Sequence, residues 1–464
     1  MSRCPQRRQP IGLLVSTVLL LAFFGVTTGA QAPAAPTPAA PSRSAPSQPA
    51  SSAAPLSLTL DDAIARGLRE NINARLQEAD VTSARGDRWV ALKDLLPQAS
   101  VRLTLTRQEI NLAAFGFSLP GFPNIVGPFN LHDSRLSVSQ PLVDLHALYE
   151  SRSGAANLRA AELTQRDTRE LVALAVRDLY LQAVTADSRS KASRVQSDTA
   201  RALLTLATDL KNAGVVPGID VLRAQVQVRT QEQRAIVAGN DFEKLKLQLA
   251  RAVGLPLAQD FVLADTIPYA PLQTLPLEEA LKQALMSRED YRAAQARLEA
   301  AEAAKRAAFA DNLPSLHLNA DYGVIGRTPA DTHSTYSVSA QLRIPVFDAA
   351  TTRGHVLEAE GLLARRGAEL NDYRARVEYE VRAAYLDLRA ADDQLQAAQD
   401  AMNLAGQELE QTRDRFAAGV AGNIEVVQAQ ETVVTATESY ISSLYAHNLA
   451  KASLAHAIGG TAAP

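Results

Sequence analysis

The sequence predicts a mainly α-helical protein with a small β part, built from two copies of one unit. In each copy a helix, a β-hairpin and two long helices follow one another. Three observations lead to this fold class. Six short passages recur in the same order, at offsets of 204 to 217 residues. Alanine-rich segments without proline carry the spacing of packed helices, and four short segments alternate apolar with polar residues.

The repeat is clearest at one turn, AGVVPGIDVLRAQ at residues 213–225, which returns as AGVAGNIEVVQAQ at residues 418–430, 205 residues later. VRDLYL and ARAVG return at the same offset as VRAAYL and AHAIG. TLDDA and LLPQ return as PLEEA and NLPS after 217 residues, because the loop of the first hairpin is longer. A repeat of this length indicates a duplicated half-domain rather than a solenoid unit. We expect the first repeat over 56–260, a linker over 261–274 and the second repeat over 275–460.

The first 55 residues predict an export segment and a tether. Arg3, Arg7 and Arg8 precede an apolar run of about 16 residues, which fits a cleaved signal peptide over 1–30 better than a membrane anchor of roughly 20. The single cysteine, Cys4, lies before that run, so we expect no lipid anchor. Residues 31–55 hold seven prolines and no large apolar side chain, which predicts a disordered Pro/Ala/Ser tether.

Two kinds of helix are expected in each repeat. A shorter one runs from about Leu60 to Leu95, and again from Leu277 to Asn312; each stops just before a proline. Proline is then absent from 142 to 216 and from 346 to 463. We expect long helices over about 144–212, 219–253, 348–417 and 423–458. The first of these would extend roughly 100 Å, which predicts a long bundle.

Alternating residues predict one hairpin in each repeat, at about 98–141 and 315–345, the first around a longer loop with Phe115, Phe117, Phe122 and Phe129. In the second hairpin the polar residues share one face: His317, Asn319, Asp321, Ser337, Ser339, Gln341 and Arg343. Four strands with one apolar face cannot close a membrane barrel, because the smallest have eight. Three copies would supply twelve strands, with the polar face toward the lumen.

These features together resemble the TolC-like family of outer membrane efflux proteins over nearly the whole chain from about residue 56 to 460. The resemblance rests on the duplicated order of elements, on QPLVD and IPVFD, and on the paired AGV turns followed by IDVLRAQ and IEVVQAQ. It implies a homotrimer with a 12-stranded transmembrane β-barrel in outer membrane lipid and an α-helical barrel in the periplasm. It also implies a periplasmic adaptor (membrane fusion) protein, an inner-membrane transporter, and service as the exit duct of a tripartite efflux or type I secretion system.

The same resemblance assigns the site residues. The turns would be the tips that meet the adaptor, with Gly214, Val215, Pro217, Gly218, Asp220, Gly419, Val420 and Gly422. Glu425 matches an acid at the periplasmic gate, Gln428 stands where a second acid is usual, and Ala421 replaces an arginine found in some members. Two plainer interpretations stay open. The glycines could serve only a tight helical reversal, and Glu425 could serve only the positive end of a helix dipole.

Other classes of function fit less well. We find no Gly-rich phosphate loop, nucleophile elbow or HExxH motif, and the seven histidines are scattered, so we expect no catalysis, cofactor or bound metal. The net charge of −3 becomes −6 once three arginines leave with the signal peptide, which argues against nucleic acid as a partner. A periplasmic coiled-coil adaptor or scaffold remains the main alternative, and a passive porin would not need so much helix. The sequence does not identify the cargo.

Overall fold

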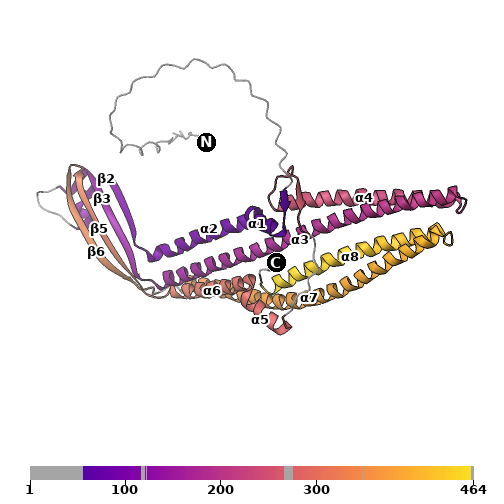
Figure 1. Ribbon diagram of the computed structural model, residues 1–464. Coiled ribbons are helices and arrows are strands. Elements are labelled where there is room, and N and C mark those ends of the chain that lie inside the picture. The colour runs from indigo at the N-terminus through magenta and orange to yellow at the C-terminus, as the bar shows by residue number, and fades with distance from the viewer. Residues whose placement is uncertain (1–55, 117–120, 122, 266–274, 347–348, 461–464) are drawn as a thin grey trace, which may run out of the picture. The chain divides into compact units, whose positions relative to one another are not determined.

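The computed structural model describes residues 56–116, 121, 123–265, 275–346 and 349–460. The expected signal peptide, tether and most of the linker, together with Phe117 and Phe122, lie outside these residues. Two antiparallel hairpins of long helices dominate the described chain. The first joins α3 (Leu145–Asn212) to α4 (Gly218–Ala252), and the second joins α7 (Ala349–Ala417) to α8 (Asn423–Ala457). Figure 1 shows the partners of each hairpin running side by side.

The long helices form because nothing in their sequences interrupts them. α3 continues for 68 residues from Asp144, whose carboxylate accepts a hydrogen bond from the Ala147 N–H at 2.9 Å. It ends at Gly214, which adopts a left-handed φ of 75°. Gly419 ends α7 in the same way, with a φ of 72°. A glycine in this conformation reverses the chain without the steric cost that a Cβ would bring.

Each shorter helix is broken where the sequence predicted a continuous one. α1 (Leu60–Glu70) and α2 (Ile72–Leu92) are separated at Asn71, and α5 (Leu277–Ser287) and α6 (Glu289–Ala310) at Arg288. Asn71 and Arg288 both have an extended backbone, with ψ of 132° and 122°. Asn71 caps the following helix through its side chain, which accepts a hydrogen bond from the Asn73 N–H. Neither break residue is a glycine or a proline, which explains why periodicity alone missed both breaks.

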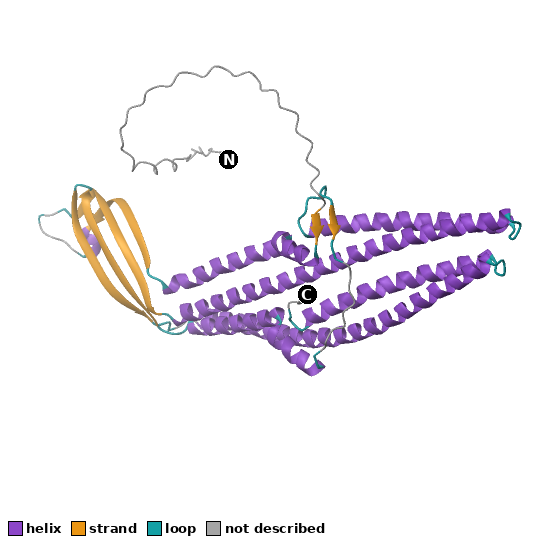
Figure 2. Ribbon diagram, in the orientation of Figure 1, coloured by secondary structure: helices purple, strands orange, loops and turns teal. Residues whose placement is uncertain are grey.

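The sheet contains four antiparallel strands in the order β2-β3-β5-β6, which Figure 2 shows as one layer. They are β2 (Gln98–Asn111), β3 (Ile125–Val143), β5 (Ser315–Thr328) and β6 (Asp331–Arg343). A short 3-10 helix, Lys93–Leu95, precedes β2, and a second one, Leu112–Phe115, follows it. Among the described residues β2 and β6 have a strand neighbour on one side only. Each repeat thus supplies one hairpin to a shared sheet with two open edges.

A second, smaller sheet was not expected from the sequence. β1 (Leu56–Leu58) and β4 (Phe261–Leu263) pair in parallel across the ends of the first repeat. Asp265 fastens this pair: its carboxylate accepts hydrogen bonds from the Leu60 N–H at 2.7 Å and from the Tyr180 hydroxyl at 2.9 Å. Segments of three residues are too short for alternation to reveal them.

The repeat is also visible in the core. One apolar cluster packs Ala63 against Val176 and Leu249, and another packs Ala280 against Val381 and Leu454. These residues are equivalent at the offsets of the sequence repeat, 217 for the alanines and 205 for the others. Each unit therefore buries the same positions between its short first helix and its two long helices. No described helix carries an apolar stretch long enough to cross a bilayer.

The glycines that end α4 and α8 generate a stability prediction. Gly459 has a φ of 75°, and a Cβ placed there would lie 2.6 Å from the Ser287 Oγ and 2.9 Å from the Arg288 backbone nitrogen. We expect Gly459→Ala to cost about 1–2 kcal/mol from its backbone conformation alone, with the clash in addition. Gly406→Ala on the exposed middle of α7 meets no atom within 4 Å, so it should stabilise by about 0.5–1 kcal/mol.

Thermal unfolding of the two variants, followed by helical circular dichroism, checks this expectation. Equal midpoints for Gly459→Ala and Gly406→Ala would contradict the assigned role of Gly459.

Candidate functional site

The predicted tip residues lie at the far ends of the two long hairpins. Pro217 caps α4, Gly218 begins it, and Gly422 caps α8. Val215 and Val420 expose 52% and 68% of their surface, so both turns present an apolar side chain to their surroundings. Asp220 differs from the expectation of a contact residue, because it is 6% exposed and pairs with Arg223 at 3.1 Å.

The two tips are joined within the chain. Asn423 is 1% exposed, and its side-chain Nδ2 donates a hydrogen bond to the Asp220 backbone oxygen at 2.9 Å. An apolar cluster beneath this bond unites both hairpins through Leu203, Ala207, Val221, Ala224, Phe416 and Val426. Asn423 is not among the site residues predicted from the sequence. A signal existed, because Asn423 occupies the position that Gly218 holds in the first repeat.

Glu425 is not an isolated acid. Its carboxylate lies 3.6 Å from the guanidinium of Arg415, which comes from the last turn of α7 in the same hairpin. The two side chains are 44% and 60% exposed, so the pair is of the weak kind, worth about 0–1 kcal/mol. The charge of Glu425, for which the sequence predicted no partner, is therefore partly neutralised by Arg415.

Gln428 lies one helical turn further along α8, on the wall of a groove between α7 and α8 with a volume of about 960 Å³. Alanines 397, 398 and 401 line the α7 side, and Thr432, Thr435 and Ser439 line the α8 side. The two threonine hydroxyls donate to backbone oxygens of their own helix. The groove wall therefore presents small, uncharged side chains, with Glu431 as its one acid.

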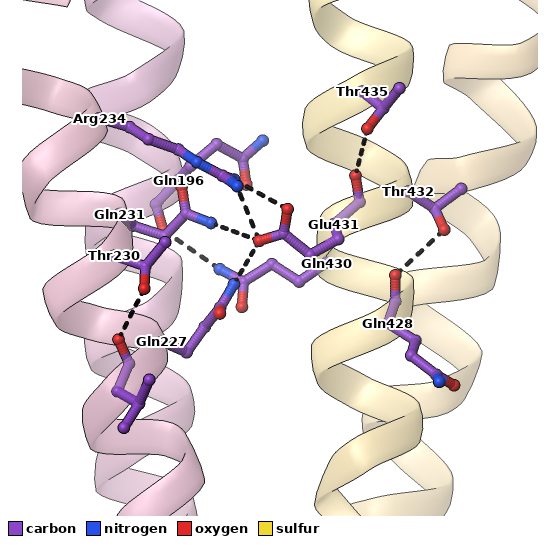
Figure 3. Close-up of polar contacts among 11 residues, drawn as sticks. Gln196, Gln227, Thr230, Gln231, Arg234, Gln428, Gln430, Glu431, Thr432 and Thr435 are labelled. Atoms are coloured by element: carbon purple, nitrogen blue, oxygen red, sulfur yellow. Dashed lines mark hydrogen bonds and ion pairs between the residues drawn. The ribbon is translucent and has the colours of Figure 1, made fainter. Parts of the chain in front are cut away.

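Glu431 is the centre of the most connected polar cluster between the hairpins (Figure 3). Its carboxylate accepts hydrogen bonds from Gln227 at 2.8 Å, from Gln231 at 3.0 Å and from two contacts of Arg234 at 2.8 and 3.0 Å. All three donors belong to α4. Burial alone would raise the pKa of Glu431, but the hydrogen bonds from Gln227 and Arg234 outweigh it and lower the pKa.

A neighbouring residue adds a second link of this kind. Gln430 is completely buried and donates from Nε2 to the Gln196 backbone oxygen of α3 at 3.3 Å, while its Oε1 has no hydrogen-bond partner among the described residues. Figure 3 shows Gln428 pointing away from this cluster. Glu431 is not among the site residues predicted from the sequence, although the repeat offers a clue: its equivalent in the first repeat is Val226.

The polar residues predicted for one face of the sheet do share a face. Strand register places His317 opposite Gln341, Asn319 opposite Ser339, Asp321 opposite Ser337, and Arg343 opposite Ser315. The first repeat continues this face, since Ser139 donates to the Asn319 side chain at 2.8 Å. The other face exposes large apolar side chains, among them Val101, Leu103, Leu105, Tyr322, Tyr336 and Val338. The sheet is therefore amphipathic across all four strands.

A charged bridge crosses the polar face. Arg135 on β3 forms ion pairs with Asp133 at 2.8 Å and with Asp321 on β5 at 2.9 Å. Gly323 lies directly opposite Arg135, and a Cβ there would lie 2.7 Å from the Arg135 Cγ. The glycine leaves room for the arginine to lie across β5. No group of three or more possible metal ligands occurs in the described part of the chain.

Comparison with known proteins fits this geometry. The profile of the family described as outer membrane efflux protein matches residues 65–255 and 280–460, one segment in each repeat. The chain is 26% identical over 416 residues to the pyoverdine export outer membrane protein OpmQ of Pseudomonas aeruginosa, covering 86% of this chain and 85% of that protein. It is 24% identical over 330 residues to the alkaline protease secretion protein AprF of the same species, covering 68% and 67%.

Solved structures agree on the fold. The outer-membrane channel OprN superposes with a TM-score of 0.75 at 20% identity, over 86% of this chain and 90% of that one. This likeness confirms the predicted fold class of paired long-helix hairpins with a few strands. Because the family profile spans both repeats, the chain belongs to the outer membrane efflux protein family and is an outer-membrane efflux channel.

Proposed function

We propose that three copies of this chain form the exit duct of a tripartite efflux or type I secretion system, receiving cargo from an inner-membrane pump through a periplasmic adaptor. One observation carries the proposal: a four-stranded sheet with an apolar and a polar face, open at both edges, is joined to two long helical hairpins. Unpaired strand edges cost several kcal/mol per group in lipid, so copies must complete the wall. Twelve strands would then enclose a lumen lined by the polar face.

The remaining parts of the proposal follow from the placement of the exposed residues. The tips offer Val215 and Val420 as the apolar contacts of the adaptor. Asp220 contributes indirectly, because its backbone oxygen accepts the hydrogen bond from Asn423 that joins the two tips. Export uses a cleaved signal peptide over residues 1–30 without a lipid anchor, as the place of Cys4 suggests. The alternative of a periplasmic scaffold is not favoured, because a scaffold has no use for an exposed apolar sheet face.

We assign the choice of cargo to the partner pump rather than to this chain. OpmQ is named for pyoverdine export and AprF for alkaline protease secretion, yet this chain is 26% and 24% identical to them over the residues matched. Because a small molecule and a protein share little chemistry, one duct surface would not recognise both kinds of cargo. The groove wall on α7 and α8, mostly alanine, threonine and serine with Glu431 as its one acid, supports a passage without a strong preference.

The proposal can be tested by placing arginine on either face of the sheet. Leu103 belongs to the apolar face and is 76% exposed, so Leu103→Arg should cost about 2–4 kcal/mol in the lipid-embedded trimer. Ser137→Arg is the matched control, because Ser137 lies opposite Asp321 on the polar face. We expect the unmodified chain and Ser137→Arg to appear in outer membranes as heat-modifiable trimers, and Leu103→Arg to be depleted. A soluble product from the unmodified chain would refute the duct.

At the entrance, the pair of Glu425 and Arg415 predicts two opposite effects. Three copies of Glu425 around an axis would attract divalent cations, and Arg415 reduces that attraction. Glu425→Gln should weaken the block of single-channel current by divalent cations in planar bilayers, by a few-fold. Arg415→Gln should strengthen it. If neither substitution alters the block, Glu425 takes no part in the gate.

The Glu431 cluster is proposed to hold the second hairpin against the first. Glu431→Gln removes the negative charge that Arg234 binds, which should cost about 1–2 kcal/mol after solvent screening. This loss would shift the equilibrium between held and released hairpins about tenfold toward the released state. We expect a higher resting conductance in bilayers. Glu438→Gln, an exposed acid on the same helix, is the control and should behave like the unmodified chain. A Glu431→Gln channel with unchanged resting current would remove the cluster from the gate.

A further inference from the structure

A buried arginine marks the break between α5 and α6. Arg288 is 5% exposed, and its guanidinium binds the Asp290 carboxylate through Nε at 3.0 Å and Nη2 at 2.6 Å. Its Nη1 donates to Glu380 on α7. Burial would raise the pKa of Asp290, but its hydrogen bonds and attraction to Arg288 lower it instead. Arg288 is therefore fully occupied by two carboxylates of the second repeat.

The first repeat brings two further acids close to this break, because α3 packs along α6 and its Arg166 lies 3.9 Å from Glu289. Asp167 and Glu170 stand three residues apart on α3, which puts them on one face of that helix. Neither forms a hydrogen bond or an ion pair with any described residue. Both are only partly exposed, so solvent compensates their charges incompletely.

Charges in this cluster do not balance. Glu289, the first residue of α6, lies 2.9 Å from Arg292 and 3.9 Å from Arg166 of α3, while its Oε2 is buried without a hydrogen-bond partner in the described chain. Burial and Arg288 lower the pKa of His456 on α8, so its neutral form is favoured. The cluster joins five acids, Asp167, Glu170, Glu289, Asp290 and Glu380, to three arginines, Arg166, Arg288 and Arg292.

The excess of acids over arginines affects the pKa values of the two acids on α3. Burial, and next the repulsion from Asp290, raise the pKa of Asp167 to about 6, although Arg288 opposes the shift. Burial and the neighbouring Asp167 raise the pKa of Glu170 as well. Both carboxyls therefore take up protons at a less acidic pH than they would in an unfolded chain, where the values are about 3.9 and 4.3.

We propose that this cluster is a proton-operated joint between the two repeats, in which Asp167 of α3 binds a proton in mildly acidic surroundings and is then held more firmly against the α5–α6 break. A neutral Asp167 no longer repels Glu289, Asp290 and Glu380, and its hydroxyl supplies a donor to a cluster that has acceptors in excess. The joint lies apart from the tips and from the sheet, so it adds a property that the proposed duct does not require.

The sign of the pH effect follows from the raised pKa. Between about pH 4 and 6 the folded chain binds more protons than the unfolded chain, so stability falls as pH rises through this window and levels off above about 6. A single such group changes the unfolded-to-folded ratio by up to about tenfold per pH unit inside the window. The joint is therefore firmest on the acidic side and under strain at neutral pH.

The test compares thermal unfolding of the purified full-length protein in detergent at pH 5.0 and pH 7.5. We expect the unmodified protein to have the higher midpoint at pH 5.0. Asp167→Asn should raise the midpoint at pH 7.5 and shrink the difference between the two pH values. Asp209→Asn, which changes an exposed acid near the end of the same helix, should leave that difference unchanged.

Two more variants separate titration from simple packing. Asp167→Glu keeps an ionisable group and should keep the pH dependence, and Glu170→Gln should reduce it to a smaller extent. The proposal is overturned if Asp167→Asn retains the full difference between pH 5.0 and 7.5, or if Glu170→Gln and Asp167→Asn both lower the midpoint at pH 7.5. The amount of trimer in the outer membrane reports separately on the duct and should be the same in all of these variants.

Discussion

The outer strands of the sheet impose the constraint on which the rest depends. β2 and β6 each leave a row of backbone N–H and C=O groups without a strand partner in the described chain. Water can satisfy such groups, but lipid cannot. An exposed apolar sheet face lies against lipid or against a partner, where water does not reach the strand edges. In the proposed duct, neighbouring copies therefore supply the missing strand partners. The two-fold repeat then supplies an even number of strands from any number of copies.

Duplication accounts for the core, and divergence accounts for the polar residues at the tips. Equivalent alanines, valines and leucines pack both units in the same way. Near the tips the equivalence is lost: Asn423 occupies the position that Gly218 holds in the first repeat, and Glu431 the position of Val226. Through these residues the second hairpin binds the first with polar groups that have no equivalent in the first repeat. The polar links therefore depend on differences between the two repeats.

Sequence patterns predicted the fold where a signal repeats over many residues. The long helices, the two hairpins and the shared polar face of His317, Asn319 and Asp321 all rest on periodicity that extends over ten residues or more. The breaks at Asn71 and Arg288 were missed because one extended residue between two good helices leaves the periodic pattern almost unchanged. β1 and β4 were missed because they have only three residues each.

The candidate site was predictable only in part, for a related reason. Glycines 214 and 419 mark the turns from local sequence, since only a left-handed residue reverses the chain there. The bonds of Glu431 join residues about 200 positions apart, and Arg415 reaches Glu425 only because the turn folds α7 back on α8. The residues next to them in the sequence do not predict such partners. The electrostatic influence of Arg288 on Asp167 of α3 likewise links residues far apart in the sequence.

The unbroken course of α3 has a mechanical consequence. This helix starts directly after β3 and continues for 68 residues to the first tip, a rise of about 100 Å. No break interrupts this helix, so bending is spread over its length. A push at the periplasmic end would therefore arrive at the base of the strands as a small tilt or rotation, and mechanical stiffness would couple the two ends of the molecule.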